Sequence, residues 1–550
     1  MISFLEFIAV NIVNEDRDFQ KIKIILPSNR ASFFLRNKIV QKIKKPVISP
    51  EIISISEFID ELSGINKVEN ISLVFELYLI YIKITPKNNQ QNFDEFMGWA
   101  PTLINDFNLI DSYLVDSNSL FSSMTSLQKI NEWGQTNKST SLNNKNNDFW
   151  ENLSVLYSSL NNKLTNEGSG TIGMQFREAV KNLEIYMSQN NKFHYFVGFN
   201  MLNTAEGNII QEFISQKKGK IFWNLDKEFY DDEKHPAGKF IRSYYKDWKC
   251  LKNKYPEGLS SNFKKNKFFH IIETSNKISQ AKYVGQIINS FETNSKNTKK
   301  GIVLGDDKTL PSLLSGIVVD PIYWNVTMGL SISSSSSLSV LNRIFEMHIN
   351  TIKGNYFYED VFSILNNDIV KHQLKKEKVN LNKLIMDLEK LNYTSFPIEK
   401  LYSNETSFQY ILFRRVESSS DLLKKIYFFI THLEKQNHFL IETSSKSEEF
   451  EIIKKIITKL LNYTDQIKNI TLKVLYSLYK EAINEQKLNF SGDPNSNIQI
   501  MTLPETRLID FDSVIITNVN EGILPKGKSS DSFISFDLKM HFKLPTFLEQ

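Results

Sequence analysis

Short apolar runs alternate along the chain with longer stretches in which apolar residues recur every three or four positions. Continuous apolar runs bounded by turn residues are typical of strands buried on both faces of a parallel sheet. The longer stretches predict amphipathic helices, because this spacing places the apolar side chains on one helical face. The pattern therefore predicts an α/β fold. The clearest strand-like runs are Ile22–Leu26, His194–Phe199, Lys220–Asn224, Gly301–Leu304 and Ser513–Val519.

The predicted strands and helices group into alternating blocks. Residues 68–190 and 351–490 have a mostly helical pattern, whereas the strand-like runs lie outside these two blocks. This order predicts two parallel-sheet domains, each interrupted by a helical insertion. The first sheet domain takes residues 1–67 and 191–262, and the second takes residues 263–350 and 491–550.

The composition is that of a globular protein with several domains. The chain has 550 residues, enough for three or four domains, and 41% of its residues are apolar. Its formal net charge of +4 is small for this length, so a DNA-binding surface would have to be local. The single cysteine, Cys250, cannot by itself form an internal disulfide, a four-cysteine zinc site or an iron–sulfur cluster. This cysteine usage fits a reducing cytoplasm.

Neither a membrane span nor a signal peptide is expected. No run approaches the roughly 18 apolar residues that a spanning helix requires. Met1–Val13 is apolar at helical spacing, but it lacks a basic start and a small-residue cleavage site. We therefore expect an amphipathic first helix.

Lysines alternate with aromatic residues in Phe263–His270, next to a predicted strand at Phe268–Ile272. Such a combination suits single-stranded nucleic acid, because lysines neutralise phosphates and aromatic rings stack on bases. A solvated basic linker between two domains would have the same composition. Both interpretations stay open at this point.

The stretch from Asn497 to Pro525 contains one of the predicted strands. Ile498–Met501 is a short apolar run, a mixed linker follows, and Ser513–Val519 is the predicted strand, β-branched and continuously apolar at its centre. Asn520-Glu521-Gly522 then turns the chain at the carboxyl end of this strand, where open α/β sheets bind their ligands.

This arrangement resembles the motif V region of superfamily-one (UvrD/Rep-like) helicases, in the divergent form found in AddB-type nuclease subunits. The linker of an active helicase carries Thr-x-His and Lys-Gly-Leu-Glu-Phe. The resemblance implies a helicase fold, with two RecA-like domains, that no longer hydrolyses nucleotide. The matching positions of this chain are Thr502, Pro504 for the His, Arg507 for the Lys, Leu508 for the Gly, and Asp510-Phe511 for Glu-Phe.

Two further regions lack residues that hold nucleotide in an active helicase. Residues 1–21, which precede the first strand, contain no glycine and cannot form a phosphate-cradling Walker A loop. The strand His194–Phe199 ends in Gly198-Phe199-Asn200, where a Walker B strand would carry the acids that hold magnesium. The next carboxylate, Glu206, is predicted to lie on the following helix.

The first strand is followed by Pro27-Ser28-Asn29-Arg30 and a predicted helix at Ala31–Lys42. Ser28 or Asn29 can cap this helix, and its free N–H groups could bind an anion. The resemblance places this corner at motif Ia, which contacts a DNA phosphate. An ordinary turn with a surface arginine is the alternative. The residues expected to bind DNA are Ser28, Asn29, Arg30, Thr502, Arg507, Lys526 and Lys528.

One stretch matches the P-loop expression GxxxxGK[ST], with Gly522, Gly527, Lys528 and Ser529 at its fixed positions. We expect no nucleotide site there. Pro525 removes a backbone N–H that a P-loop uses to bind phosphate. The polar residues that follow do not predict a helix beginning at the loop, and too few remain for a Walker B strand. An active ATP-dependent helicase that uses this loop is the alternative.

The resemblance implies a DNA-binding, nucleotide-hydrolysis-deficient part of a double-strand-break repair and recombination nuclease. Its expected partners are DNA, as a single strand and as a duplex end, and an AddA-like motor subunit. No catalytic residue, metal ligand or cofactor is expected in this chain. A protein-interaction scaffold without DNA contact is a further alternative.

AddB-type proteins continue into a PD-(D/E)xK nuclease domain, in which two acids and a lysine hold magnesium. Asp387–Lys390 contains similar residues, but it lies in a helical pattern and lacks the separation that the site needs. The chain is therefore expected to be the N-terminal portion of a longer exonuclease subunit, cut before motif VI at Gln550.

Overall fold

The computed structural model describes most of the chain, and its residues cluster into two compact units. One unit takes residues 1–90, 100–325 and 493–550, and the other takes residues 91–99 and 326–492. The longer segment of the second unit begins at residue 326, before residue 351, where the second helical insertion was predicted to start. The described residues are 3–15, 17–43, 46–133, 141–290, 298–318, 323–332, 335–390, 393–402, 404–436, 444–467, 469–488, 493, 495–526 and 531–546.

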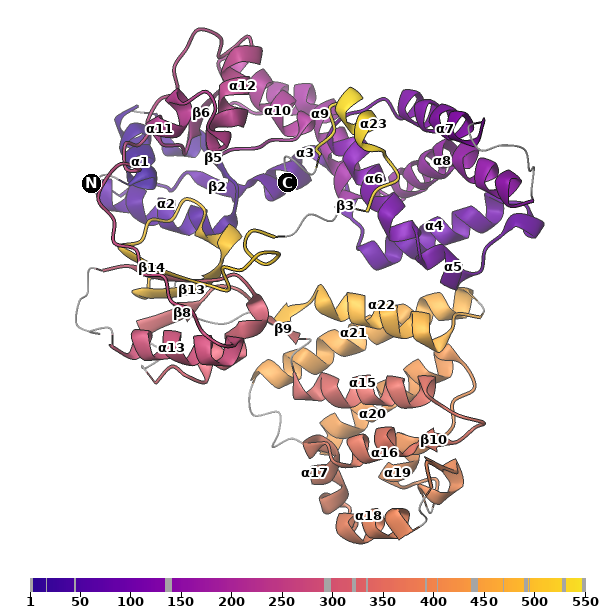
Figure 1. Cartoon of the computed structure of the whole chain (residues 1–550). Helices are drawn as coiled ribbons and strands as arrows, with labels where there is room; N and C mark the ends of the chain where they lie inside the picture. Colours follow the sequence, from indigo (N-terminus) through magenta and orange to yellow (C-terminus); the bar gives the residue numbers. More distant parts are fainter. Residues whose placement is uncertain are drawn as a thin grey trace. The chain divides into compact units, whose positions relative to one another are not determined.

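The first unit contains a four-stranded parallel sheet in the order β2-β1-β5-β6 (Figure 1). Every residue of β1 is buried, as its continuous apolar run predicts. β1 aligns Ile24 with Ile52 on one side and with Tyr195 on the other. The strands are β1 (Ile22–Leu26), β2 (Glu51–Ser54), β5 (Phe193–Phe199) and β6 (Gly219–Trp223).

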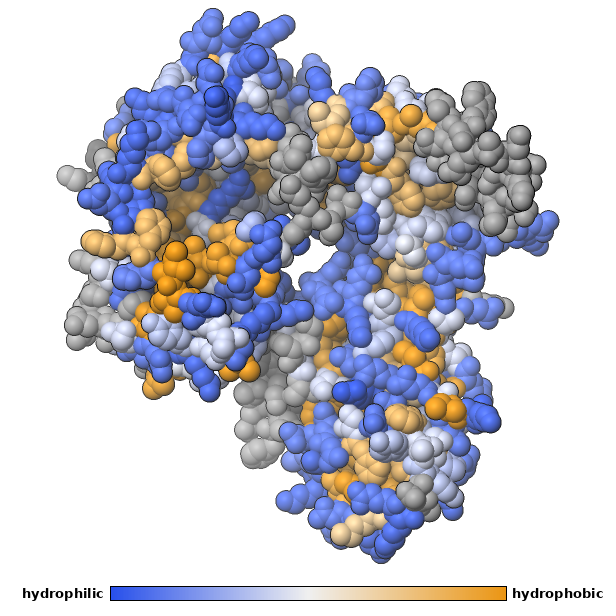
Figure 2. Space-filling model, in the orientation of Figure 1, coloured by the Kyte–Doolittle hydropathy of each residue, from blue (hydrophilic) through white to orange (hydrophobic). Residues whose placement is uncertain are grey.

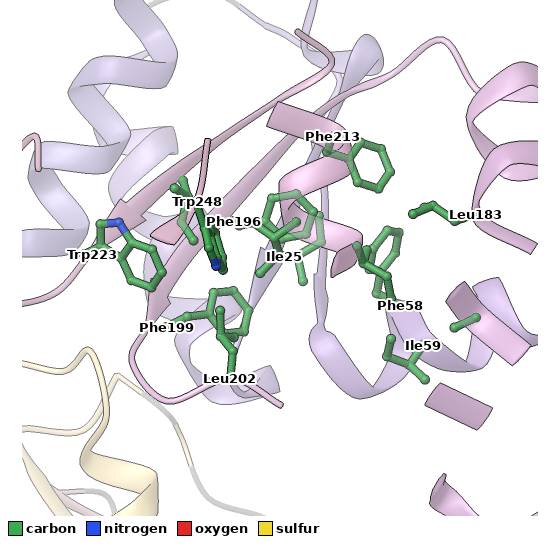
Figure 3. Close-up of a cluster of buried hydrophobic side chains, with 14 of the residues drawn as sticks. Ile25, Phe58, Ile59, Leu183, Phe196, Phe199, Leu202, Phe213, Trp223 and Trp248 are labelled. Atoms are coloured by element: carbon green, nitrogen blue, oxygen red, sulfur yellow. The ribbon is translucent and has the colours of Figure 1, made fainter. Parts of the chain in front are cut away.

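Helices cover both faces of this sheet, and successive strand residues enter different apolar clusters. Ile25 and Phe196 belong to the cluster in Figure 3, together with Phe58, Phe213 and Trp248. Ile24 and Tyr195 belong to a second cluster with side chains from α1 and α2. The covering helices are α1 (Phe4–Asn14), α2 (Asn29–Lys42), α3 (Ile55–Ser63), α10 (Thr204–Ser215), α11 (Lys227–Asp231) and α12 (Lys239–Asp247).

Most of the predicted helical insertion forms within the first unit, whereas its residues 91–99 belong to the second. The insertion also holds a two-residue parallel ladder between β3 (Asn66–Lys67) and β4 (Ser169–Gly170). Helix α8 begins at Ser141, in a stretch rich in asparagine whose composition suits a loop. Apolar packing further along a helix stabilises its polar turns, which composition alone does not indicate. The helices of the insertion in the first unit are α4 (Asn70–Ile84), α6 (Ala100–Ser112), α7 (Ser117–Trp133), α8 (Ser141–Asn166) and α9 (Ile172–Gln189).

The segment 531–546, which contains α23 (Phe536–His541), packs on this insertion (Figure 1). The buried carboxylate of Asp106 accepts hydrogen bonds from Ser532 Oγ at 2.6 Å and from Phe533 N at 2.7 Å. The ring of Phe533 lies edge-on to that of Trp150, with 6.0 Å between centroids. These contacts hold together parts of the chain that are far apart in sequence.

A second four-stranded sheet has the order β14-β7-β13-β8, in which β7 pairs in parallel with β14 and with β13. Helices α13 (Lys277–Ser290) and α14 (Leu310–Leu314) pack beside it. Two parallel sheets with helical insertions confirm the predicted fold class. The strands are β7 (Lys300–Leu304), β8 (Trp324–Val326), β13 (Ile498–Thr502) and β14 (Ser513–Thr517).

The predicted burial of β14 on both faces is wrong. β14 lies at the edge of its sheet, and the side chains of Val514 and Ile516 are 48% and 49% exposed. Figure 2 shows hydrophobic surface in the region of β14. The composition of an apolar run shows that the run can form a strand. Whether that strand is buried depends on its position in the sheet, which pairing with distant strands decides.

The predicted strand at Phe268–Ile272 is also absent. This segment makes no ladder in the structure, and the side chains of Phe268 and Phe269 are 95% and 80% exposed. Aromatic and β-branched residues suit a strand only where a neighbouring strand is available to pair.

The second unit is mostly helical. Helix α20 (Ser419–Gln436) carries apolar residues at every third or fourth position, and these are buried, including Leu422, Ile426 and Ile430. Two short antiparallel ribbons pair β10 (Tyr356–Phe357) with β11 (Ser395–Phe396), and β9 (Leu330–Ser331) with β12 (Lys487–Leu488). The helices are α5 (Phe93–Met97), α15 (Ser336–Ile349), α16 (Tyr358–Leu365), α17 (Asp368–Lys376), α18 (Leu381–Lys390), α19 (Phe408–Phe413), α20 (Ser419–Gln436), α21 (Ser444–Gln466) and α22 (Leu472–Asn484).

Among the described helices of both units, none combines the length and the apolar character that a bilayer-spanning segment needs.

Candidate nucleic-acid interface

Three of the predicted DNA-binding residues lie at the corner between β1 and α2, at the carboxyl end of the first sheet. Ser28 occupies the predicted cap position of α2, but its side chain makes no capping hydrogen bond, and its Oγ is buried without a partner among the described residues. Asn29 is exposed, and its Nδ2 donates to Glu57 Oε1 at 3.1 Å. A carboxylate therefore adjoins the corner that was expected to meet a phosphate.

Arg30 reaches from this corner to the second sheet. Its Nη2 donates to Gln499 Oε1 on β13 at 2.6 Å, and the same oxygen accepts from Asn325 Nδ2 at 3.1 Å. Burial lowers the pKa of Arg30 to about 10, and the charge of Glu505 opposes that shift. Arg30 thus bonds to protein across the junction of the two sheets, and its guanidinium is half-buried rather than open to a ligand.

The linker between β13 and β14 fills the space at the carboxyl end of the first sheet. It begins with a short 3-10 helix, η8 (Leu503–Thr506), and continues to Leu508, which is 5% exposed and packs in the first sheet's apolar cluster. A Cβ placed on Gly198 would lie only 2.3 Å from Leu508 Cδ2. Leu508 therefore covers the end of β5, where a Walker B strand would present its acids.

Both residues of this contact have backbone conformations that depend on the packing. Gly198 has a φ of +77° and Leu508 a φ of +67°. A positive φ is unstrained for glycine but costs about 1 kcal/mol or more for a residue with a side chain. Leu508 therefore keeps a left-handed backbone conformation while its side chain packs against Gly198.

Thr502 and Arg507, the two predicted DNA-binding residues of the linker, each interact with an acidic residue. The backbone N–H of Thr502 donates to Glu505 Oε2 at 3.0 Å. Burial raises the pKa of Glu206, and the positive charge of Arg507 opposes the rise. The Glu206 carboxylate accepts from Asn203 N at 3.0 Å in a capping box at the start of α10. Glu206 lies on the helix after β5, as predicted, and caps that helix.

Among the described residues, no hydrogen bond or ion pair joins Lys526 to the other predicted DNA-binding residues. It is exposed and closes a turn with Gly522, whose φ is +83°. Gly527, Lys528 and Ser529 lie outside the described residues. Residues 531–535 are not helical, and the next described helix begins at Phe536. A phosphate site of this type needs a helix that begins at the loop, and the described residues 531–535 do not continue such a helix.

Sequence reasoning left the exposed basic and aromatic segment unassigned. Asp226 anchors its beginning, because Oδ2 accepts from Asn262 N at 2.6 Å and from Phe263 N at 3.0 Å. The rings of Phe268 and Phe269 that follow are almost wholly exposed. The alternation of lysine and phenylalanine in the sequence indicated this surface, but a basic linker between domains would show the same alternation.

Among the described residues, no group of three or more His, Cys, Asp and Glu side chains is placed to hold a metal ion. A scan against models of known protein families finds no match, and a search of curated proteins finds no significant relative.

Proposed function

We propose that this chain is the DNA-binding, nucleotide-hydrolysis-deficient helicase-like part of an AddB-like repair and recombination nuclease, acting in the cytoplasm beside a motor subunit. The observation that supports it most is the Leu508 side chain at the end of β5. An active motor needs acids and a metal ion at that place, and an apolar side chain supplies neither. Duplex unwinding would then depend on the partner motor.

The support for DNA binding comes mainly from the segment that follows Asp226. Phe268 and Phe269 offer free ring faces, and Lys264, Lys265 and Lys267 precede them. Lys264 pairs with Glu228 at 2.6 Å, so the basic charge here is partly balanced. Rings that stack on bases beside a few lysines are suited to a single strand, whose bases are accessible, rather than to a closed duplex. Exposed Arg507 and Lys526 are the remaining candidates for phosphate contacts.

Fluorescence anisotropy with a labelled single-stranded 20-mer tests this proposal. Base stacking contributes about 1–3 kcal/mol per base, so the double variant Phe268→Ala/Phe269→Ala should weaken binding at least tenfold. Phe428→Ala, at an exposed position of α20 in the other unit, is the matched control and should leave the affinity unchanged. Equal affinities for the double variant and the unmodified chain would contradict this mode of binding.

The alternative of an active ATPase has its own test. Filter binding with labelled ATP and magnesium should detect no saturable binding at micromolar nucleotide. Micromolar binding that Lys528→Ala abolishes would replace our proposal with a P-loop motor.

A scaffold without DNA contact is favoured by one feature, the acids beside the predicted contacts. Glu57 adjoins Asn29, and the charges of Glu505 and Glu206 influence the pKa values of Arg30 and Arg507. Carboxylates in these places repel phosphate. Absence of binding to single-stranded DNA at low salt, with the chain folded by circular dichroism, would decide for the scaffold.

A further inference from the structure

The second unit contains a cavity of about 750 Å³ between α16, α18 and the β10–β11 ribbon. This volume falls within the roughly 300–1,000 Å³ range of pockets that bind small ligands or side chains. The DNA proposal makes no use of it, and none of the predicted DNA-binding residues lines it.

Aromatic rings form much of the cavity wall. Phe362 on α16 and Phe396 on β11 pack edge to face with 5.9 Å between ring centroids, and Phe396 is buried. Tyr358 and Tyr393 stand at the rim, where both rings are partly exposed. The floor is therefore fixed by core packing, while the side chains of Tyr358 and Tyr393 keep exposed surface that a ligand can contact.

The charge of the lining has one sign. Glu359 on α16 and Glu389 on α18 are its charged members, and no lysine, arginine or histidine is among the described lining residues. The hydroxyl of Tyr358 donates to Glu359 Oε1 at 3.1 Å, which orients that carboxylate at the rim. A cation is the complementary ligand, and a phosphate would be repelled.

We propose that this cavity binds an arginine side chain, flanked by apolar residues, of an extended segment in a partner polypeptide. A planar guanidinium stacks on aromatic rings and pairs with carboxylates, a combination that an ammonium group satisfies less well. Ile385 of α18, which is partly exposed, adds aliphatic surface for the residue next to the arginine. This binding does not depend on the proposed DNA function, because the two surfaces share no residue.

The test uses the whole chain and a fluorescein-labelled pentapeptide, Gly-Leu-Arg-Leu-Gly, followed by anisotropy. A second peptide carries citrulline, a neutral analogue of arginine, at the centre. We expect saturable binding of the arginine peptide, at least tenfold weaker binding of the citrulline peptide, and at least fivefold weaker binding after Glu389→Gln. Glu399→Gln is the matched control, because Glu399 is exposed on the neighbouring 3-10 helix η7 (Ile398–Lys400) outside the cavity.

The remaining outcomes each overturn the proposal. No saturable binding of the arginine peptide, or equal binding of the citrulline peptide, would exclude recognition of a guanidinium. An equal loss for Glu399→Gln and Glu389→Gln would show general electrostatics rather than this cavity. Competition by free arginine as strong as that by unlabelled peptide would favour a small cation over a polypeptide. A DNA-binding chain that fails these tests would leave the proposed function intact.

Discussion

The side chain of Leu508 lies directly over the Cα atom of Gly198, in the space that a Cβ on Gly198 would occupy. The two residues are far apart in sequence, and each has a positive φ. Their contact joins the linker of the second sheet to the apolar cluster of the first. This apolar contact fills the end of β5 and is the main reason why we propose a helicase-like module without nucleotide hydrolysis.

Gly198→Ala should destabilise the first unit strongly. The new Cβ would overlap Leu508 Cδ2, and alanine would be strained at a φ of +77°. Together these effects should cost about 2–4 kcal/mol in the free energy of unfolding, measured by urea denaturation. Gly168→Ala is the matched control, since Gly168 has a φ of +64° but open space around its Cα. Equal losses for the two variants would contradict the proposed packing.

Leu508→Ala and Leu508→Gly should both destabilise the chain, but by different amounts. Each removes the buried side chain and leaves a cavity, which costs about 2–5 kcal/mol. Glycine also relieves the strain of the positive φ, so Leu508→Gly should be the more stable variant by about 1 kcal/mol. In backbone with a negative φ, alanine is more stable than glycine. If Leu508→Ala were the more stable variant, Leu508 would not be held in a left-handed conformation.

A buried lysine in the second unit predicts a pH effect on stability. Lys425 Nζ lies 2.8 Å from His348 Nε2 and donates to the Arg414 carbonyl at 3.0 Å. Tyr356 OH lies 3.1 Å from His348 Nδ1. Burial, reinforced by the charge of Arg414, holds the pKa of Lys425 well below its usual value, and the more distant carboxylate of Asp421 opposes the shift only partly.

The sign of this effect follows from proton binding. Above the folded-state pKa of Lys425 the unfolded chain binds more protons than the folded chain, so stability rises with pH until about pH 10.4, where an unfolded lysine titrates. Chemical denaturation at pH 7, 8 and 9 should therefore show the stability of the unmodified chain rising relative to that of Lys425→Met. A constant difference across these three values would mean that Lys425 is protonated in the folded chain throughout.

The exposed edge of β14 predicts self-association. Ser513–Thr517 contains no charge or proline, which are the residues that usually prevent edge strands from pairing with another chain. Ile516→Lys should reduce concentration-dependent association in sedimentation velocity. Ile185→Lys, at an exposed position on helix α9, is the control and should have no such effect. Association that persists unchanged in Ile516→Lys would show that another surface is responsible.

Local structure was predictable from sequence where local chemistry decides it. Ser54 and Glu57 form the capping box that begins α3, three residues apart in sequence. β1 and β5 were predicted from continuous apolar runs and are buried as expected. In each case the residues that determine the element lie within it or one turn away.

The candidate site was less predictable because its contacts are long-range. Nothing near Arg30 in sequence indicates that its guanidinium will meet Gln499, which lies on a strand of the other sheet. Leu508 was identified as a departure from glycine, but its role as a plug required the position of Gly198. The exposure of Val514 depends on the order of strands, which the composition of β14 does not contain.

The salt dependence of single-stranded DNA binding tests the central claim most directly. Phosphate contacts by lysine and arginine lower the logarithm of the binding constant by about 0.7 per contact for each tenfold rise in salt. We predict measurable binding with a clearly negative slope, unchanged by ATP and magnesium, and a slope shallower by about 0.7 in Lys526→Ala. Binding that is absent at low salt, or that ATP and magnesium shift strongly, would contradict a DNA-binding module that has lost its nucleotide chemistry.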